Sequence, residues 1–187
     1  MLYDTVWPSL QREDVHPIVV SDYTKRGPWD VAKEAWRHAH DRYTHWMVLQ
    51  DDFVVCDNFL KLAHNFVDRH PNDACCVFQP AAFNPNDVKN LMNHGDFEVP
   101  AHMIPWGGSL ILPVSLVPNV IEIGDILDGM GTEDDTRIAH ALRWLNVTCY
   151  NVGVSLIKHI GAGHSVVQNP SNDGNVTYRT GFTYVGD

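Results

Sequence analysis

Asp51 and Asp52 are the residues of this 187-residue chain whose types and spacing point most directly to chemistry. They follow the apolar run Trp46–Leu49, which predicts a strand buried on both faces of a sheet. Two adjacent carboxylates repel each other unless a cation or protons intervene. In open α/β sheets, ligands gather at the carboxyl ends of strands. The pair is therefore a candidate site for a divalent cation and a phosphate-bearing ligand, and the alternative is a solvated turn after a strand.

Two further clusters carry residue types that binding or catalysis uses. Gly107 and Gly108, after Trp106, have no side chains and let a ligand approach the backbone closely. A simple turn before a strand is the alternative interpretation. Three consecutive acids, Glu133–Asp135, begin a predicted helix, where acids offset the helix dipole. One of these acids is also a candidate general base for an attacking hydroxyl.

A late histidine is the remaining candidate for a metal ligand. His159 follows an apolar, strand-like run and precedes the Gly-rich turn Gly161–Gly163. Its imidazole is therefore placed to point at a metal, and His164 is the alternative ligand. A structural histidine with no metal is the alternative role.

Composition and charge limit the classes of function. The chain is 44% hydrophobic and 19% charged, which is ordinary for a globular protein, and its length predicts one domain over residues 1–187. It has no apolar run long enough for a transmembrane helix and no signal-peptide pattern at its N-terminus. The net charge of −10 argues against a broad electrostatic grip on nucleic acid. For contact with nucleic acid, the sequence offers one local basic cluster, which is formed by Lys25, Arg26, Lys33 and Arg37.

The cysteines predict the redox environment. None of the four has C-x-x-C spacing, and two of them lie inside a strand-like run; they are Cys56, Cys75, Cys76 and Cys149. This pattern predicts buried free thiols in a reducing compartment rather than disulfides or a zinc site. We therefore expect a cytoplasmic protein.

The elements that must position these residues alternate between strands and helices. Residues 16–21 predict a strand that ends at Ser21 and Asp22, and residues 29–43 carry one apolar stripe of a helix. With the strand at 46–49 they predict a βαβ unit, hence a parallel pair. Further helices are expected at 58–69 with Asp57 as N-cap, at 84–92, at 113–128 with a break at Pro118, and after Thr132. Further strands are expected at 74–79, 109–112, 148–152 and 154–160, followed by a loop-rich tail at 165–187.

In this order, the motifs resemble those of glycosyltransferases of the GT-A fold. The acidic DXD motif corresponds to Gln50-Asp51-Asp52, with glutamine where many relatives carry an acid. The later motifs correspond to Trp106-Gly107-Gly108, to Glu133-Asp134 with Asp135, and to His159. The run Val154–Gly161 is similar to the P-S-L-x-x-H-x-G ending of several such families, and the resemblance covers residues 15–164. It implies a Rossmann-like α/β domain with a mostly parallel central sheet and helices on both faces.

The resemblance implies a metal-dependent transfer of a sugar from a nucleotide-sugar donor, UDP- or GDP-linked, to a hydroxyl acceptor. A Mn²⁺ or Mg²⁺ ion on Asp52 and His159 would offset the charge that builds on the departing nucleotide diphosphate. One imidazole among oxygen ligands favours Mn²⁺. Asp51 would contact the ribose or a water on the metal.

The resemblance also implies roles for the remaining candidates. Asp134, or in its place Asp135, would be the base of an enzyme that inverts the sugar anomer, whereas retaining enzymes need no base there. The implied donor contacts are Ser21 and Asp22 at the nucleoside, and Trp106, Gly107 and Gly108 at the donor sugar and the acceptor.

Other functions stay open from the sequence. The acceptor is a polysaccharide, a protein, a lipid-linked sugar or a modified DNA base. The alternatives to a transferase are a non-catalytic nucleotide- or sugar-binding module, a degenerate transferase, and a carboxylate-metal phosphoesterase. The observation that separates these classes is whether Asp52 and His159 converge on one cation.

Overall fold

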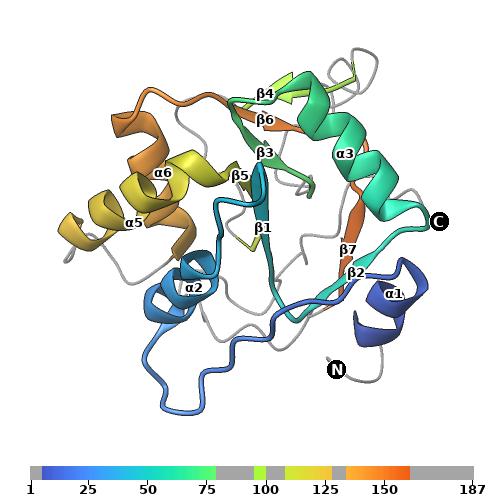
Figure 1. The fold of residues 1–187 in the computed structure, drawn as a ribbon, viewed down its shortest axis with the longest axis horizontal. Helices are drawn as coiled ribbons and strands as arrows, with labels where there is room; N and C mark the ends of the chain where they lie inside the picture. Colours follow the sequence, from blue (N-terminus) through green and yellow to red (C-terminus); the bar gives the residue numbers. More distant parts are fainter. Residues whose placement is uncertain (1–5, 79–94, 100–107, 128–133, 161–187) are drawn as a thin grey trace, which may run out of the picture.

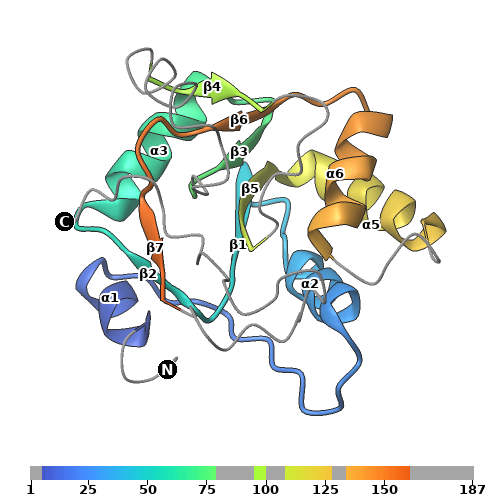
Figure 2. The same cartoon turned by 180° about the vertical axis from the view of Figure 1, so that it is seen from behind.

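A mixed α/β domain is seen in the computed structural model, which describes residues 6–78, 95–99, 108–127 and 134–160 (Figure 1). Its main sheet has five strands in the order β1 (His45–Leu49), β5 (Ser109–Pro113), β3 (Ala74–Cys76), β6 (Cys149–Asn151) and β4 (Phe97–Glu98). A second sheet pairs β2 (Phe53–Val55) with β7 (Ile157–His159). The same strands are seen from behind in Figure 2.

The prediction of a mostly parallel, GT-A-type sheet, which the resemblance implied, is wrong. Only β3 and β6 pair in parallel, and every other pair in both sheets is antiparallel. The predicted βαβ unit fails because residues 16–21 form no strand, and Ile18 and Val19 are 56% and 46% exposed. β1 pairs instead with β5, which arrives later in the chain and runs the opposite way. An apolar run predicts that a segment is buried, but neither its partner nor its direction.

The strand predicted at 46–49 is confirmed as β1, but its expected burial on both faces is not. β1 is an edge strand that pairs only with β5, and its five residues are all partly exposed. Of the other predicted strands, β3, β6 and β7 lie within the runs that indicated them, and β5 extends one residue beyond its run, to Pro113. β2 and the short β4 were not predicted.

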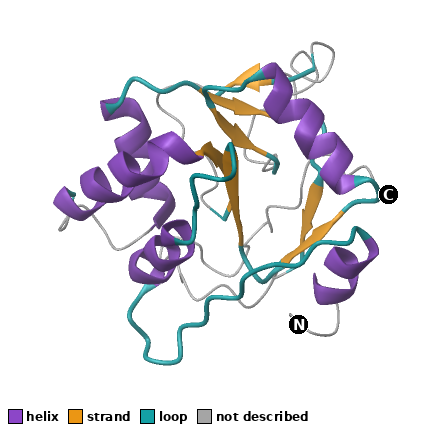
Figure 3. Cartoon of the chain, viewed as in Figure 1, coloured by secondary structure: helices purple, strands orange, loops and turns teal. Residues whose placement is uncertain are grey.

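Several predicted helices are confirmed with different ends (Figure 3). α2 (Pro28–Arg37) stops well before residue 43, and α3 (Phe59–Arg69) is preceded by Asn58 in a left-handed conformation rather than capped by Asp57. The one or two short helices expected at 113–128 are confirmed as the 3₁₀ turn Val114–Leu116 and α5 (Val117–Ile126), but Pro118 lies in the first turn of α5 and not between the two.

Two helices complete the described set. α6 (Asp134–Trp144) follows the acidic run as predicted, and α1 (Trp7–Arg12) was not predicted. Thr132, the helix expected at 84–92 and the tail at 165–187 lie outside the described residues. No helix in the described ranges has the length and apolar character needed to cross a membrane.

Apolar side chains form a core on each face of the main sheet. β5 alternates between the two, because Leu110 and Leu112 pack on α2, α5 and α6, whereas Ile111 packs on the side of α1 and α3. In Figures 1 and 2, α2, α5 and α6 accordingly lie together on one side of β1, and α3, β2 and β7 lie on the other.

We predict that Leu110→Ala lowers the free energy of unfolding by about 2–5 kcal/mol, because the side chain is fully buried and leaves a cavity. Leu60→Ala on α3 is the matched control, since Leu60 is 39% exposed, and it should cost about 1 kcal/mol or less. Urea unfolding of both variants measures this. Equal losses would contradict the assignment of Leu110 to the core.

All four cysteines are free and buried, as predicted from their spacing. Burial raises the pKa of the Cys56 thiol to about 11 and that of the Cys75 thiol to about 12. Burial also raises the pKa of Cys149 well above its ordinary value. These thiols are therefore neutral core side chains at physiological pH, not reactive nucleophiles.

We predict that the free energy of unfolding falls as the pH rises above about 9, where the unfolded thiols ionise. The folded thiols of Cys56 and Cys75 ionise only near 11 and 12, so the folded state holds more protons in between and loses stability through that window. Cys75→Ala should flatten the dependence. Urea unfolding at about pH 8 and about pH 10 compares the two proteins, and parallel profiles would contradict this account.

Candidate functional site

The turn at Asp51 and Asp52 is where the chain passes from the main sheet to the second sheet. It joins the end of β1 to the start of β2 (Figure 1). The two carboxylates therefore follow an edge strand directly and precede a strand of a different sheet. This position agrees with the prediction that the pair ends a strand.

The antiparallel ladder of β2 and β7 brings this turn beside the strand that ends in His159. Phe53 lies opposite His159, and Val55 lies opposite Ile157. The backbone N–H of Ile160 donates to the carbonyl oxygen of Asp52 at 2.7 Å, which extends the ladder by one residue. The backbones of Asp52 and His159 are therefore on adjacent strands, one residue out of register.

The register of this ladder is fixed by burial. Phe53, Val55 and Ile157 are fully buried in the core beneath α1 and α3. Because side chains alternate between faces, a slip of one residue would turn these apolar groups towards the opposite face. The position of Asp52 relative to His159 is thus a consequence of apolar packing.

The two carboxylates differ in their exposure to solvent. Asp51 is exposed, whereas Asp52 is partly buried and its Oδ1 atom is shielded from solvent. A charge interacts more strongly with a nearby cation where solvent screening is weaker. Asp52 is therefore the better placed of the two to hold a cation, and Asp51 is free to contact a ligand in solution.

Gly108 lies next to the acidic turn on the neighbouring strand. Leu49 pairs with Ser109, and the N–H of Gln50 donates to the carbonyl oxygen of Gly108 at 3.0 Å. A Cβ on Gly108 would overlap the Gln50 side chain. The glycine is therefore needed for contact with Gln50, a reason that the sequence did not indicate. Trp106 and Gly107 lie outside the described residues.

We predict that Gly108→Ala lowers the free energy of unfolding by about 1–3 kcal/mol, because the added methyl group displaces Gln50. The same change made in a Gln50→Ala background should cost less, since the overlapping atoms are gone. A double-mutant cycle measured by urea unfolding should give a coupling of at least about 0.5 kcal/mol. Additive effects would show that the two residues do not share this contact.

Asp134 and Asp135 begin α6, and both are partly buried. The Asp135 carboxylate accepts a hydrogen bond from the N–H of Thr136 at 2.7 Å. The main contacts of α6 are with α5 and α2, on the other side of β1 from the β2–β7 ladder (Figures 1 and 2). The helix that carries the candidate bases therefore packs mainly on α5 and α2. Glu133 lies outside the described residues.

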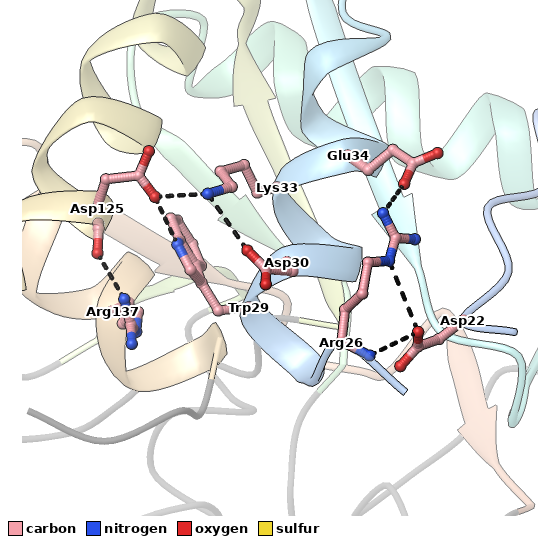
Figure 4. Close-up of polar contacts among 9 residues, drawn as sticks. Asp22, Arg26, Trp29, Asp30, Lys33, Glu34, Asp125 and Arg137 are labelled. Atoms are coloured by element: carbon pink, nitrogen blue, oxygen red, sulfur yellow. Dashed lines mark hydrogen bonds and ion pairs between the residues drawn. The ribbon is translucent and has the colours of Figure 1, made fainter. Parts of the chain in front are cut away.

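Ser21 and Asp22 do not end a strand, because the expected strand is absent. The Asp22 carboxylate accepts a hydrogen bond from the N–H of Arg26 at 2.9 Å (Figure 4). It also accepts one from the N–H of Gly27 at 3.4 Å. The bond from Arg26 lowers the pKa of Asp22 below its ordinary value. Asp22 thus stabilises the turn that leads into α2, while Ser21 is exposed.

A second polar site, which the sequence did not indicate, lies where α2, α5 and α6 meet (Figure 4). The Asp125 carboxylate on α5 accepts hydrogen bonds from Trp29 and Lys33 on α2. No local pattern links residues so far apart in the chain. The sequence had marked only Arg26 and Lys33, as part of a basic cluster.

The described residues supply only part of the ligand set predicted for a metal. Among the described residues, no three His, Cys, Asp or Glu side chains converge on a point that could hold a metal ion. The described part of the ladder supplies the carboxylates of Asp51 and Asp52 and the backbone position of His159. His164, the alternative ligand, lies outside the described residues.

No protein-family model matches the chain, and no curated protein matches it significantly. The function is therefore argued from the motifs and from the geometry of the described residues.

Proposed function

We propose that this protein is a metal-dependent glycosyltransferase, which moves a sugar from a nucleotide-sugar donor to a hydroxyl acceptor. The observation that carries the proposal is the β2–β7 ladder, in which the Asp51–Asp52 turn and the His159 strand are neighbours. These two motifs belong to one metal site in the enzymes that the sequence resembles.

The chemistry of the donor set suits the proposed Mn²⁺ or Mg²⁺. Asp51 and Asp52 offer carboxylate oxygens and His159 offers an imidazole, and such ligands suit Mn²⁺ and, for the oxygens, Mg²⁺. Proteins commonly bind these ions through only one or two carboxylates, with substrate phosphates supplying further oxygens. When bound, the metal would act as a Lewis acid that stabilises the departing nucleotide diphosphate.

The chain's own residues would hold the cation, contact the donor and accept the proton of the acceptor. Asp52, with its shielded Oδ1, and His159 would hold the cation, and the exposed Asp51 would contact the ribose or a water. Asp134, or Asp135, would take the proton of the acceptor hydroxyl if the enzyme inverts the anomer. Ser21 is proposed at the nucleoside. Asp22 would act there through the turn that its carboxylate stabilises.

The donor is proposed to be a UDP- or GDP-sugar, and a thermal-shift assay tests this. UDP or GDP with Mn²⁺, at about 100-fold its dissociation constant, should stabilise the folded state by about 2.7 kcal/mol. For a chain of this length, that raises the melting temperature by about 5–10 °C. Asp52→Asn should abolish the part of the shift that depends on Mn²⁺, because it removes a charged ligand.

Asp41→Asn is the matched control, since Asp41 is an exposed aspartate outside the acidic turn, and its shift should equal that of the wild type. Nucleotide binding that needs no Mn²⁺ and survives Asp52→Asn would favour a binding module. The absence of a shift with every nucleotide diphosphate in the presence of Mn²⁺ would contradict the proposed transferase.

A further inference from the structure

A polar pocket of about 460 Å³ lies between the N-terminal end of α2, the C-terminal end of α5 and the first turn of α6 (Figure 4). We name it the α2–α6 pocket. Its described lining consists of Arg26, Gly27, Trp29, Asp30, Lys33, Asp125 and Arg137. The volume falls within the range of pockets that hold small organic ligands.

Asp125 and Lys33 form the centre of the lining. The Oδ1 atom of Asp125 accepts hydrogen bonds from Lys33 Nζ at 2.8 Å and from Trp29 Nε1 at 2.9 Å. Lys33 Nζ also lies 3.3 Å from the Asp30 carboxylate, so Lys33 links the two acids. Asp125 is 44% exposed at its side chain, whereas Lys33 is only 17% exposed. The two acids therefore keep carboxylate surface open to a ligand, while Lys33 is held in place.

The charges of this group are stable at neutral pH. Hydrogen bonding to Asp125 raises the pKa of Lys33 above its ordinary value. Burial tends to raise the pKa of Asp125, but the hydrogen bonds from Lys33 and Trp29 outweigh burial and leave it lowered. Fixed donors and fixed acceptors therefore stand side by side in one pocket.

Arg137 adds an immobilised donor group to the wall. Its side chain is on α6, and only 5% of the residue is exposed. Its guanidinium donates to the carbonyl oxygen of Gly124 at 3.0 Å and lies 5.6 Å from the centre of the Trp29 ring. Such contacts orient a guanidinium precisely, because its donors lie in one plane.

The balance of charge argues against an anionic ligand. The pocket is lined by the cations Arg26, Lys33 and Arg137 and by the acids Asp30 and Asp125. Lys33 is already paired with both of these acids, and Arg26 is paired with Asp22 and Glu34. A phosphate or carboxylate entering the pocket would therefore meet carboxylates as well as cations that are already paired.

Closely spaced donors and acceptors suit a ligand rich in hydroxyl groups. A hydroxyl both donates and accepts, so it can bond a carboxylate on one side and an ammonium or guanidinium on the other. Neighbouring hydroxyls on a sugar ring repeat this pattern. Hydrogen bonds to charged partners are also the stronger ones, which offsets the cost of removing the hydroxyls from water.

We propose that the α2–α6 pocket binds a saccharide and that this saccharide is the acceptor of the transfer, an inference whose second part rests on the proposed function. Asp134 precedes Arg137 by three residues on α6, so the candidate base is on the same helix face as a pocket residue. A saccharide acceptor narrows the candidates to a polysaccharide or a lipid-linked sugar. A protein side chain and a modified DNA base are then excluded as acceptors.

In an inverting reaction at this pocket, one bond to the anomeric carbon forms while another breaks. The acceptor oxygen forms a bond to the anomeric carbon of the donor sugar. The bond from that carbon to the diphosphate oxygen breaks, and its electron pair leaves with the nucleotide diphosphate. The proton of the acceptor hydroxyl passes to the Asp134 carboxylate.

Saccharide titration of the full chain, followed by NMR chemical shifts, tests the inference. The probes are maltose, cellobiose, lactose and N,N′-diacetylchitobiose at millimolar concentrations. At least one probe should bind, and Lys33→Met and Asp125→Asn should each weaken its binding about tenfold or more, because each removes a charged partner. Lys61→Met and Asp57→Asn are the matched controls on exposed positions and should bind as the wild type does.

The outcomes separate this inference from the proposed function, because UDP and GDP with Mn²⁺ are titrated into the same samples. Saccharide binding that is weakened by the pocket variants, together with intact nucleotide binding, supports the inference. Nucleotide binding without any saccharide binding, or with binding that the variants leave unchanged, overturns the inference alone. Saccharide binding without nucleotide binding supports the pocket but overturns the acceptor role and the transferase with it.

Two further measurements cover the case of a variant that fails to fold and the case of a pocket that binds anions. If Asp125→Asn fails to fold, as judged by its circular dichroism, Asp30→Asn takes its place, because Asp30 is half exposed and also contacts Lys33. Inorganic phosphate is titrated as the anionic probe. Binding of phosphate that is lost in Lys33→Met, with no saccharide binding, would overturn the inference in favour of an anion site.

Discussion

The pairing of β2 with β7 is the contact on which the candidate site depends, because it joins segments that are far apart in the sequence. The buried residues Phe53, Val55 and Ile157 fix the register of this pairing. Asp52 is therefore held beside the His159 strand by apolar packing beneath α1 and α3. At the other end of the turn, the pairing of Gln50 with Gly108 anchors β1 to β5. A charged turn between two anchored strands keeps its geometry without a ligand.

The parts of the fold that were predicted correctly are those with a local signal. The apolar stripe of α3 and the buried runs at β1, β3 and β5 follow from spacing alone. Whether neighbouring strands run parallel or antiparallel does not follow from spacing, because it depends on which distant strand pairs with β1. Residues 16–21 show this most clearly, since their β-branched composition favours a strand, yet Ile18 and Val19 remain exposed. The hydrogen bonds that Asp22 accepts from the backbone of Arg26 and Gly27 were not predicted either, because they span four and five residues, whereas the usual turn formed by an aspartate bonds the backbone two residues on.

The candidate site was predicted only in part, because only some of its features have a local signal in the sequence. The order of the acidic, glycine and histidine motifs indicated that they belong together. The two sheet ladders bring Gln50, just before the acidic pair, next to Gly108, and bring Asp52 next to the His159 strand. The α2–α6 pocket could not be predicted, because Trp29 and Lys33 on α2 bond Asp125 on α5, which is 96 and 92 residues away in the sequence. In Figures 1 and 2, α2, α5 and α6 lie on one side of β1, and β2 and β7 lie on the other.

The most direct test of the central claim is the position of a bound cation. Mn²⁺ broadens the NMR signals of nearby nuclei, so an amide spectrum recorded with Mn²⁺ and either UDP or GDP shows which residues surround the ion. The account predicts broadening on both strands of the ladder, at Asp52 and Phe53 and at His159 and Ile160, with no change at Lys61 on α3. Broadening confined to other acids, such as Asp30 and Asp125, or to only one of the two strands, would contradict it.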